Sequence, residues 1–227
     1  MSGTLLGAKL SVVRALSTFV MALALAQPAG AQVFGAPARY GGASWWVGID
    51  AGNTRAVNVS DGPSSANWGL EAAKPIRLAI DYRQRDRTIG VSVSQAIVPL
   101  TFSGSACSAC RGQVTVQQAM ARYRIVAPLF GPGMYSVTEL SVGATRWSAL
   151  QGLDGSQLGV MAPNTDFTYG LSLGAALPLG DRLELTAMYD MSTLKHETQK
   201  STASNAFSNA SLKLATLRFG ARLRLGT

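Results

Sequence analysis

The chain has 227 residues, of which 47% are hydrophobic and 14% charged, and its formal net charge is +8 at pH 7. This length suits one domain, and no region of different composition divides it. The basic residues are scattered rather than clustered on a helix, which argues against a nucleic-acid-binding protein.

The first predicted element is an export signal. Lys9 and Arg14 precede an apolar run, Ala15 to Ala26, and Pro28 and small residues up to Ala31 follow it. This order is typical of a secretory signal peptide that is cleaved after Ala31. The alternative is an anchor helix, but the apolar run is shorter than the roughly 20 residues that a helix needs to span a bilayer.

After the signal, apolar residues alternate with small or polar residues at a period of two, and no amphipathic helical periodicity occurs. Such alternation is typical of β-strands with one apolar face. The other face consists mostly of glycine, serine, threonine and alanine with a few charges. The pattern predicts eight strands: Trp45–Gly52, Ile76–Tyr82, Ile89–Ile97, Ala119–Ile125, Glu139–Ala144, Phe167–Leu177, Leu183–Met191 and Thr216–Thr227.

The predicted connections alternate in length. Three are short and carry turn formers: Arg83–Arg87, Leu129–Met134 and Pro178–Arg182. Four are long: Asn53–Asn67, Ser103–Gly112, Ser148–Asn164 and Lys195–Ala210. Short connections at one end and long ones at the other indicate an up-and-down barrel, with the short turns facing the periplasm if the barrel lies in an outer membrane.

The composition of the small and polar face indicates which way it points. A water-soluble barrel covers its exterior with long charged and polar side chains, whereas this face offers small residues and isolated charges. The interior of an eight-stranded barrel is just wide enough for side chains to fill it. We therefore expect the apolar face to contact lipid and the other face to fill the lumen, without an open pore. Aromatic residues near strand ends fit the two water interfaces: Trp45, Tyr82, Trp147, Phe167 and Tyr169.

Charges of both signs lie on the predicted inward face. Because a buried ion needs a partner, we predict lumen ion pairs among these residues. Centring the turn between Gly131 and Pro132 places Arg124 opposite Glu139, so these two are expected to pair, and Glu184 is expected near Arg222 or Arg224. The full set is Asp50, Arg77, Asp81, Arg122, Arg124, Glu139, Glu184, Asp190, Arg218, Arg222 and Arg224.

In this architecture the chain resembles the small eight-stranded outer-membrane barrels of the OmpA and OmpX type, over Ser44 to Leu225. The resemblance implies an all-β, eight-stranded antiparallel up-and-down transmembrane β-barrel in the bacterial outer membrane. It also implies a monomer that contacts outer-membrane lipids and the outer-membrane assembly machinery, has a structural or surface-interaction role, and has neither enzymatic activity nor a cofactor. The expected organisation is a signal peptide (1–31), a short N-terminal segment (32–43) and the barrel (44–227).

The two cysteines, Cys107 and Cys110, lie in the predicted loop Ser103–Gly112. In an oxidising compartment a turn there suits a local disulfide. A metal site and free thiols are the alternatives. A zinc site needs further ligands, and the chain's single histidine, His196, lies in another predicted loop, so we predict no metal site.

Three other functions stay open. A lipid-modifying enzyme would need a reactive serine near His196, but Thr198 stands where the His-x-Ser pattern of outer-membrane deacylases and acyltransferases requires serine. A soluble periplasmic ligand-binding barrel would be released without detergent, and a transport pore needs more than eight strands. Basic loop residues face either the phosphates of lipopolysaccharide or solvent: Arg55, Arg111, Arg146, Lys195 and Lys200.

Overall fold

A computed structural model describes residues 42–61, 66–104, 107–130, 133–152, 164–197 and 209–226. The predicted signal peptide lies outside these ranges. Within them the chain forms strands joined by turns and short irregular connections. No helix in the described part has the length and apolar character required to cross a membrane.

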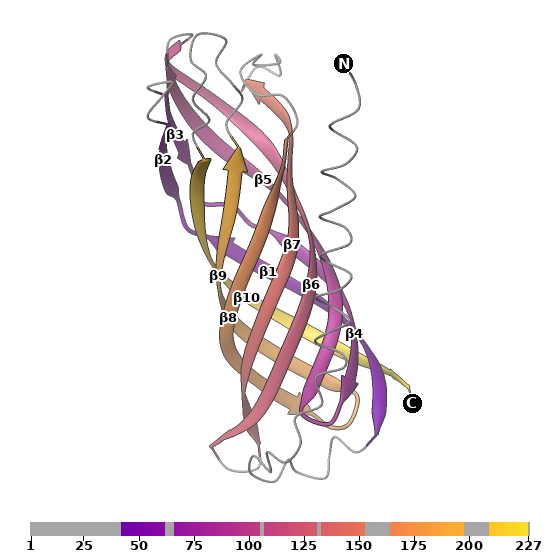
Figure 1. The fold of residues 1–227 in the computed structure, drawn as a ribbon. Helices are drawn as coiled ribbons and strands as arrows, with labels where there is room; N and C mark the ends of the chain where they lie inside the picture. The colour runs from indigo at the N-terminus through magenta and orange to yellow at the C-terminus, as the bar shows by residue number, and fades with distance from the viewer. Residues whose placement is uncertain are drawn as a thin grey trace, which may run out of the picture. The chain divides into compact units, whose positions relative to one another are not determined.

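The described chain contains ten strands, and Figure 1 shows them coloured by residue number from the N-terminus to the C-terminus. They are β1 (Ala43–Thr54), β2 (Val57–Asp61), β3 (Ala66–Leu70), β4 (Ile76–Gln84), β5 (Arg87–Gly104), β6 (Cys107–Phe130), β7 (Met134–Gly152), β8 (Asn164–Leu179), β9 (Leu183–Glu197) and β10 (Asn209–Gly226).

Eight of these strands close a ring. Strand β1 pairs with β4, every following strand from β4 to β10 pairs with the next, and β10 returns to pair with β1, all antiparallel. In Figure 1 the yellow C-terminal strand accordingly lies beside the indigo first strand. The predicted fold class, an eight-stranded antiparallel up-and-down barrel, is confirmed.

Strands β2 and β3 lengthen the first hairpin. Strand β3 pairs with β5 beyond the end of β4, and β2 pairs with β3. Backbone hydrogen bonds bridge the interruption: Gly52 N donates to Pro75 O at 2.9 Å and Thr54 N to Ala73 O at 2.8 Å. The prediction of a long loop over Asn53–Asn67 is therefore wrong for most of that segment, because the first hairpin continues through it.

The other long connections are shorter than predicted for the same reason. Strands β5 and β6 cover all of Ser103–Gly112 except residues 105–106. Strand β7 runs on to Gly152, β9 to Glu197, and β10 begins at Asn209. We call the end of the barrel that holds the turns at 85–86 and 180–182 and the connection from β6 to β7 the turn end, and the opposite end the loop end.

In the half of the barrel next to the turn end, the predicted outward faces are confirmed. Large apolar side chains on these faces have more than a third of their surface exposed, and they come from every strand of the ring. Examples are Ile49 on β1, Leu78 on β4, Val91 on β5, Ile125 on β6, Leu140 on β7, Leu173 on β8, Leu185 on β9 and Phe219 on β10.

In the half next to the loop end the polarity is reversed. Its inward side chains form an apolar core that includes Val98, Val114, Val116, Leu194 and Leu212, all buried. Its exposed outward side chains include Gln95, Gln117, Lys195 and Lys213. This half has the apolar core and polar exterior of a water-soluble protein. The sequence prediction assumed that the same face of each strand is apolar along its whole length. The reversal explains why the predicted strands end too early.

Candidate functional site in the barrel interior

Strand β6 shows the layers of the interior in order from the turn end. Its inward residues begin with Val126, which belongs to a buried apolar cluster with Tyr135 and Val137. Arg124 and Arg122 follow, both nearly inaccessible to solvent, and Val116 joins the apolar core of the loop half. The charged layer thus lies between two apolar layers, where its charges need partners inside the barrel.

Glu139 on β7 is the centre of the charged layer. Its carboxylate lies 3.3 Å from Arg77 on β4, 3.2 Å from Arg122 on β6 and 3.0 Å from Arg218 on β10. Arg222, also on β10, lies 3.7 Å away. The Glu139 side chain is only 1% exposed. One carboxylate therefore connects arginines from three other strands across the lumen.

Two aspartates complete this arrangement. Asp81 on β4 lies 2.5 Å from both Arg122 and Arg222. Asp50 on β1 lies 2.9 Å from Arg77 and 3.4 Å from Arg218. Each of these arginines contacts more than one carboxylate, so the layer is a network of shared ion pairs rather than a set of separate ones.

Glu184 on β9 forms a second group closer to the turn end. Its carboxylate lies 2.8 Å from Arg83 and 3.1 Å from Arg124, and the latter contact lacks hydrogen-bond geometry. The Arg83 guanidinium also lies over the Trp46 ring, 5.6 Å from its centroid. These side chains come from β1, β4, β6 and β9, so this group also joins strands that are not neighbours.

The predicted ion pair between Arg124 and Glu139 is wrong. The strand register does place the two residues directly opposite each other, as expected. In a narrow closed barrel, however, side chains meet across the lumen, and the Arg124 guanidinium contacts Glu184 instead. Glu184 lies opposite Arg222 in the register, as predicted, yet Arg222 contacts Asp81 and Glu139.

The remaining predicted residues differ in their contacts. Asp190 lies 2.6 Å from Arg218. For Arg224, no ion pair is found among the described side chains, and its backbone N donates to Arg182 O at 2.8 Å. Arg83, which sequence reasoning placed in a turn, is buried. The alternation of inward Arg77 and Asp81, extended by one step, would have found it.

Trp147 is a further correction. We expected it at a water interface, but it is 5% exposed and its indole Nε1 donates to Asp166 at 2.6 Å inside the loop half. The Thr145 and Thr168 hydroxyls lie 2.7 Å apart beside it. Of the other aromatic residues predicted at interfaces, Trp45, Tyr82, Phe167 and Tyr169 are exposed.

Glycines opposite the charged residues make room for them. Asp50 faces Gly220 across the β1–β10 pair, and Asp81 faces Gly90 across the β4–β5 pair. A Cβ atom built on either glycine would collide with the facing carboxylate. The small residues of the inward face therefore belong to the same arrangement as its charges.

Replacing Gly220 with alanine tests this fit. The new methyl group would displace the Asp50 carboxylate from Arg77, so we expect Gly220→Ala to lower the free energy of unfolding by about 1 to 3 kcal/mol, as overpacking does elsewhere. Urea unfolding of the folded protein in lipid vesicles, followed by tryptophan fluorescence, measures this. Gly133→Ala is the control, since a Cβ there has no atom within 4 Å. Equal stability of both variants would contradict the tight fit.

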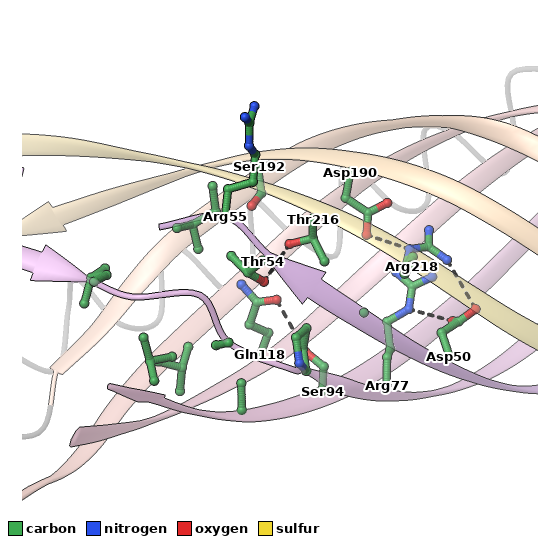
Figure 2. Close-up of a pocket in the computed structure, with 18 of the residues that line it drawn as sticks. Asp50, Thr54, Arg55, Arg77, Ser94, Gln118, Asp190, Ser192, Thr216 and Arg218 are labelled. Atoms are coloured by element: carbon green, nitrogen blue, oxygen red, sulfur yellow. Dashed lines mark hydrogen bonds and ion pairs between the residues drawn. The ribbon is translucent and has the colours of Figure 1, made fainter. Parts of the chain in front are cut away.

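A small cavity lies on the loop side of the charged layer (Figure 2). Its volume is about 90 Å³. Figure 2 shows Asp190, Arg218, Asp50 and Arg77 joined by ion pairs on one side of the cavity, with Thr54 and other hydroxyl and amide groups on its wall. This space is large enough for several waters.

The remaining sequence predictions concern cysteine and histidine. Cys107 begins β6 rather than lying in a loop, and Cys110 lies opposite Phe102. The Cys107 side chain is outside the described side chains, so the disulfide between the two stays a prediction. The His196 side chain is also outside them. No group of three metal-ligating side chains occurs in the described part of the chain.

Comparison with known proteins identifies the architecture. No protein-family model matches the chain, and no curated protein matches it. Among solved structures, Neisserial surface protein A (NspA) aligns with 81% of this chain and 99% of its own, with a TM-score of 0.56 and 17% identity. The outer membrane protein OprG from Pseudomonas aeruginosa aligns over 81% and 97%, with a TM-score of 0.50 and 10% identity. The chain therefore has the fold of the small eight-stranded outer-membrane β-barrels, as the sequence resemblance predicts.

Proposed function

We propose that this protein is an integral outer-membrane β-barrel with a structural or surface-interaction role, a closed lumen and no enzymatic activity. The reversal of polarity along the barrel carries this proposal. The apolar exterior of the turn half suits lipid, whereas the polar exterior and apolar core of the loop half suit water. The turn half would lie in the membrane, and the loop half would project from the cell surface as a rigid support for the connections at its end.

The proposal of a closed lumen rests on the charged network and on the cavity. Guanidinium and carboxylate groups from β1, β4, β6, β7, β9 and β10 meet across the interior. The cavity of about 90 Å³ is well below the roughly 300 to 1,000 Å³ of ligand pockets. Both features favour a structural barrel over a transport pore or a ligand carrier.

The two other open functions lack support of this kind. A soluble periplasmic barrel would have to leave the apolar outward faces of the turn half in water, which is costly for such a large patch. A lipid-modifying enzyme needs a nucleophile beside a base, and the described side chains of the barrel offer a network of arginines and carboxylates instead. We therefore propose contact with outer-membrane lipids and insertion by the outer-membrane assembly machinery.

Planar-bilayer recording tests the closed lumen. We expect the purified protein to give no steady ion conductance, because guanidinium and carboxylate groups of the charged layer meet across the lumen. Detergent-dependent extraction from outer membranes and heat-modifiable migration on a gel would show that the recorded protein is folded and membrane-embedded. A large and stable open channel would overturn the closed lumen, and release without detergent would overturn the membrane location.

A further inference from the structure

Four of the exposed basic side chains in the loop half lie along one stretch of its outer surface. They are Arg146 on β7, Lys195 on β9, Lys213 on β10 and Arg55, which directly follows β1. We call them the basic stripe. Figure 2 shows the Arg55 side chain pointing away from the cavity.

The strand register makes the stripe continuous from β1 to β9. Arg55 N donates to Ala215 O at 2.9 Å, which places Arg55 beside Ala215, two residues from Lys213. Lys213 pairs with Thr193, two residues from Lys195. Residues related in this diagonal way are about 7 to 8 Å apart on the same face of a sheet. Consecutive members of the stripe are thus close enough to contact one anionic group.

The stripe continues across β8 to β7. Lys195 pairs with Phe167 on β8, and Arg146 pairs with Thr165, two residues from Phe167 on the same outward face. Neighbouring strands lie about 4.8 Å apart. Arg146 and Lys195 therefore flank one strand, with the Thr165 position between them.

Exposed apolar and aromatic side chains border the stripe on the side of the turn end. Phe167 and Tyr169 lie with ring centroids 6.2 Å apart and are both exposed. Met191 on β9 and Leu217 on β10 are exposed four residues from Lys195 and Lys213. Cations beside aromatic rings at the edge of an apolar surface are typical of a lipid–water interface.

The charge around the stripe is of one sign on β7 to β10 as far as the structure describes it. Asp166 is buried and bonded to Trp147, and Asp190 binds Arg218 inside the barrel. Glu197, which ends β9, has a side chain outside the described ones. No described outward side chain bordering the stripe on these strands is acidic. On β7 to β10 the stripe therefore presents a surplus of positive charge at the boundary between the two halves.

From this placement we infer that the basic stripe binds the phosphate groups of an outer-leaflet glycolipid, lipopolysaccharide. Guanidinium and ammonium groups donate charge-assisted hydrogen bonds to phosphate, and the bordering aromatic and apolar residues would contact acyl chains. The inference rests on the proposed membrane position of the barrel. Of the five basic residues proposed from the sequence for phosphate contact, Arg55, Arg146 and Lys195 belong to the stripe. Arg111 is exposed on β6, opposite Thr101, and is not part of the stripe, whereas Lys200 lies outside the described residues. Lys213 is an additional member of the stripe.

The test compares two triple variants of the full folded barrel in detergent micelles. The stripe variant is Arg146→Gln, Lys195→Gln and Lys213→Gln. The control variant is Arg85→Gln, Arg87→Gln and Arg182→Gln, which removes the same charge at the turn end. Each protein is titrated with bis-phosphorylated lipid A, with lipid A lacking both phosphates, and with phosphatidylglycerol, and bound lipid is counted by native mass spectrometry.

We expect the affinity of the stripe variant for phosphorylated lipid A to fall by on the order of tenfold or more. The affinity of the control variant should stay within about twofold of the parent, because the stripe and not the net charge makes the contact. Phosphate-free lipid A should bind all three proteins weakly. Equal loss in both variants, or none in the stripe variant, would overturn the proposal, and equal binding of phosphatidylglycerol would overturn the choice of glycolipid.

Two safeguards keep the result interpretable. Heat-modifiable migration reports whether each variant is folded, and the three single substitutions replace the triple variant if it is not, with a stepwise loss expected. The micelle titration measures lipid A binding by the stripe even if fractionation shows that the protein is not membrane-embedded. Failure of the proposed function and failure of this inference are therefore distinguishable.

Discussion

In a double-mutant cycle, Arg124→Met and Glu184→Gln are expected to be strongly coupled, whereas Arg124→Met and Glu139→Gln are expected to be nearly additive. Removing one partner of a buried ion pair leaves the other charge unpaired and costs on the order of 3 to 5 kcal/mol. Once Arg124 is gone, the loss of Glu184 should therefore add less than it does alone, and the part that remains reflects its contact with Arg83. The free energy of unfolding in urea, measured for the parent and all variants in lipid vesicles, gives both coupling energies.

The two glutamates are a matched pair for this test. Both side chains are 1% exposed. Glu184 contacts arginines from two other strands, and Glu139 contacts arginines from three. They differ in that Arg124 contacts Glu184 and not Glu139, although Glu139 is its direct neighbour in the register. A coupling energy between Arg124 and Glu139 that exceeds the one between Arg124 and Glu184 would mean that Arg124 pairs within the hairpin. It would contradict the contact of Arg124 with Glu184 across the lumen.

Much of the turn half could be predicted from the sequence because one rule governs it. On its outward face, each strand shows apolar residues at every second position, and the inward charges appear between them. The fold class and the inward positions of Asp50 and Arg218 follow from this rule. The choice of partners does not, since it depends on which strands face each other across a closed ring. Adjacent strands alone predict Arg124 with Glu139, and the structure has Arg124 with Glu184.

The loop half could not be predicted in the same way because its rule is inverted. There Val114 and Val116 point inward and Gln117 points outward. The strand is therefore lost when apolar residues are taken to point outward throughout. Trp147 was misplaced for the same reason, as its position near a predicted strand end suggested an interface. The strands can be predicted at their full length if the apolar residues are allowed to switch from the outward to the inward positions along one strand.

Leu173→Arg is expected to prevent stable insertion of the barrel into membranes. Leu173 is exposed on the outward face of β8, between Thr138 of β7 and Tyr189 of β9 in the register. An arginine on the lipid face costs about 2 to 4 kcal/mol near the bilayer midplane and about 0 to 1 kcal/mol near the interface. The fraction of protein that becomes heat-modifiable after refolding into lipid vesicles measures the effect.

Thr101→Arg is the matched control, because it adds the same side chain to an exposed outward position in the loop half. We expect this variant to insert as the parent does, since the position would lie in water. Ser172→Thr, which changes the buried neighbour of Leu173 by one methyl group, should also insert. If Leu173→Arg inserts as well as Thr101→Arg, the two halves of the barrel do not differ in their surroundings, and the apolar exterior of the turn half does not contact lipid.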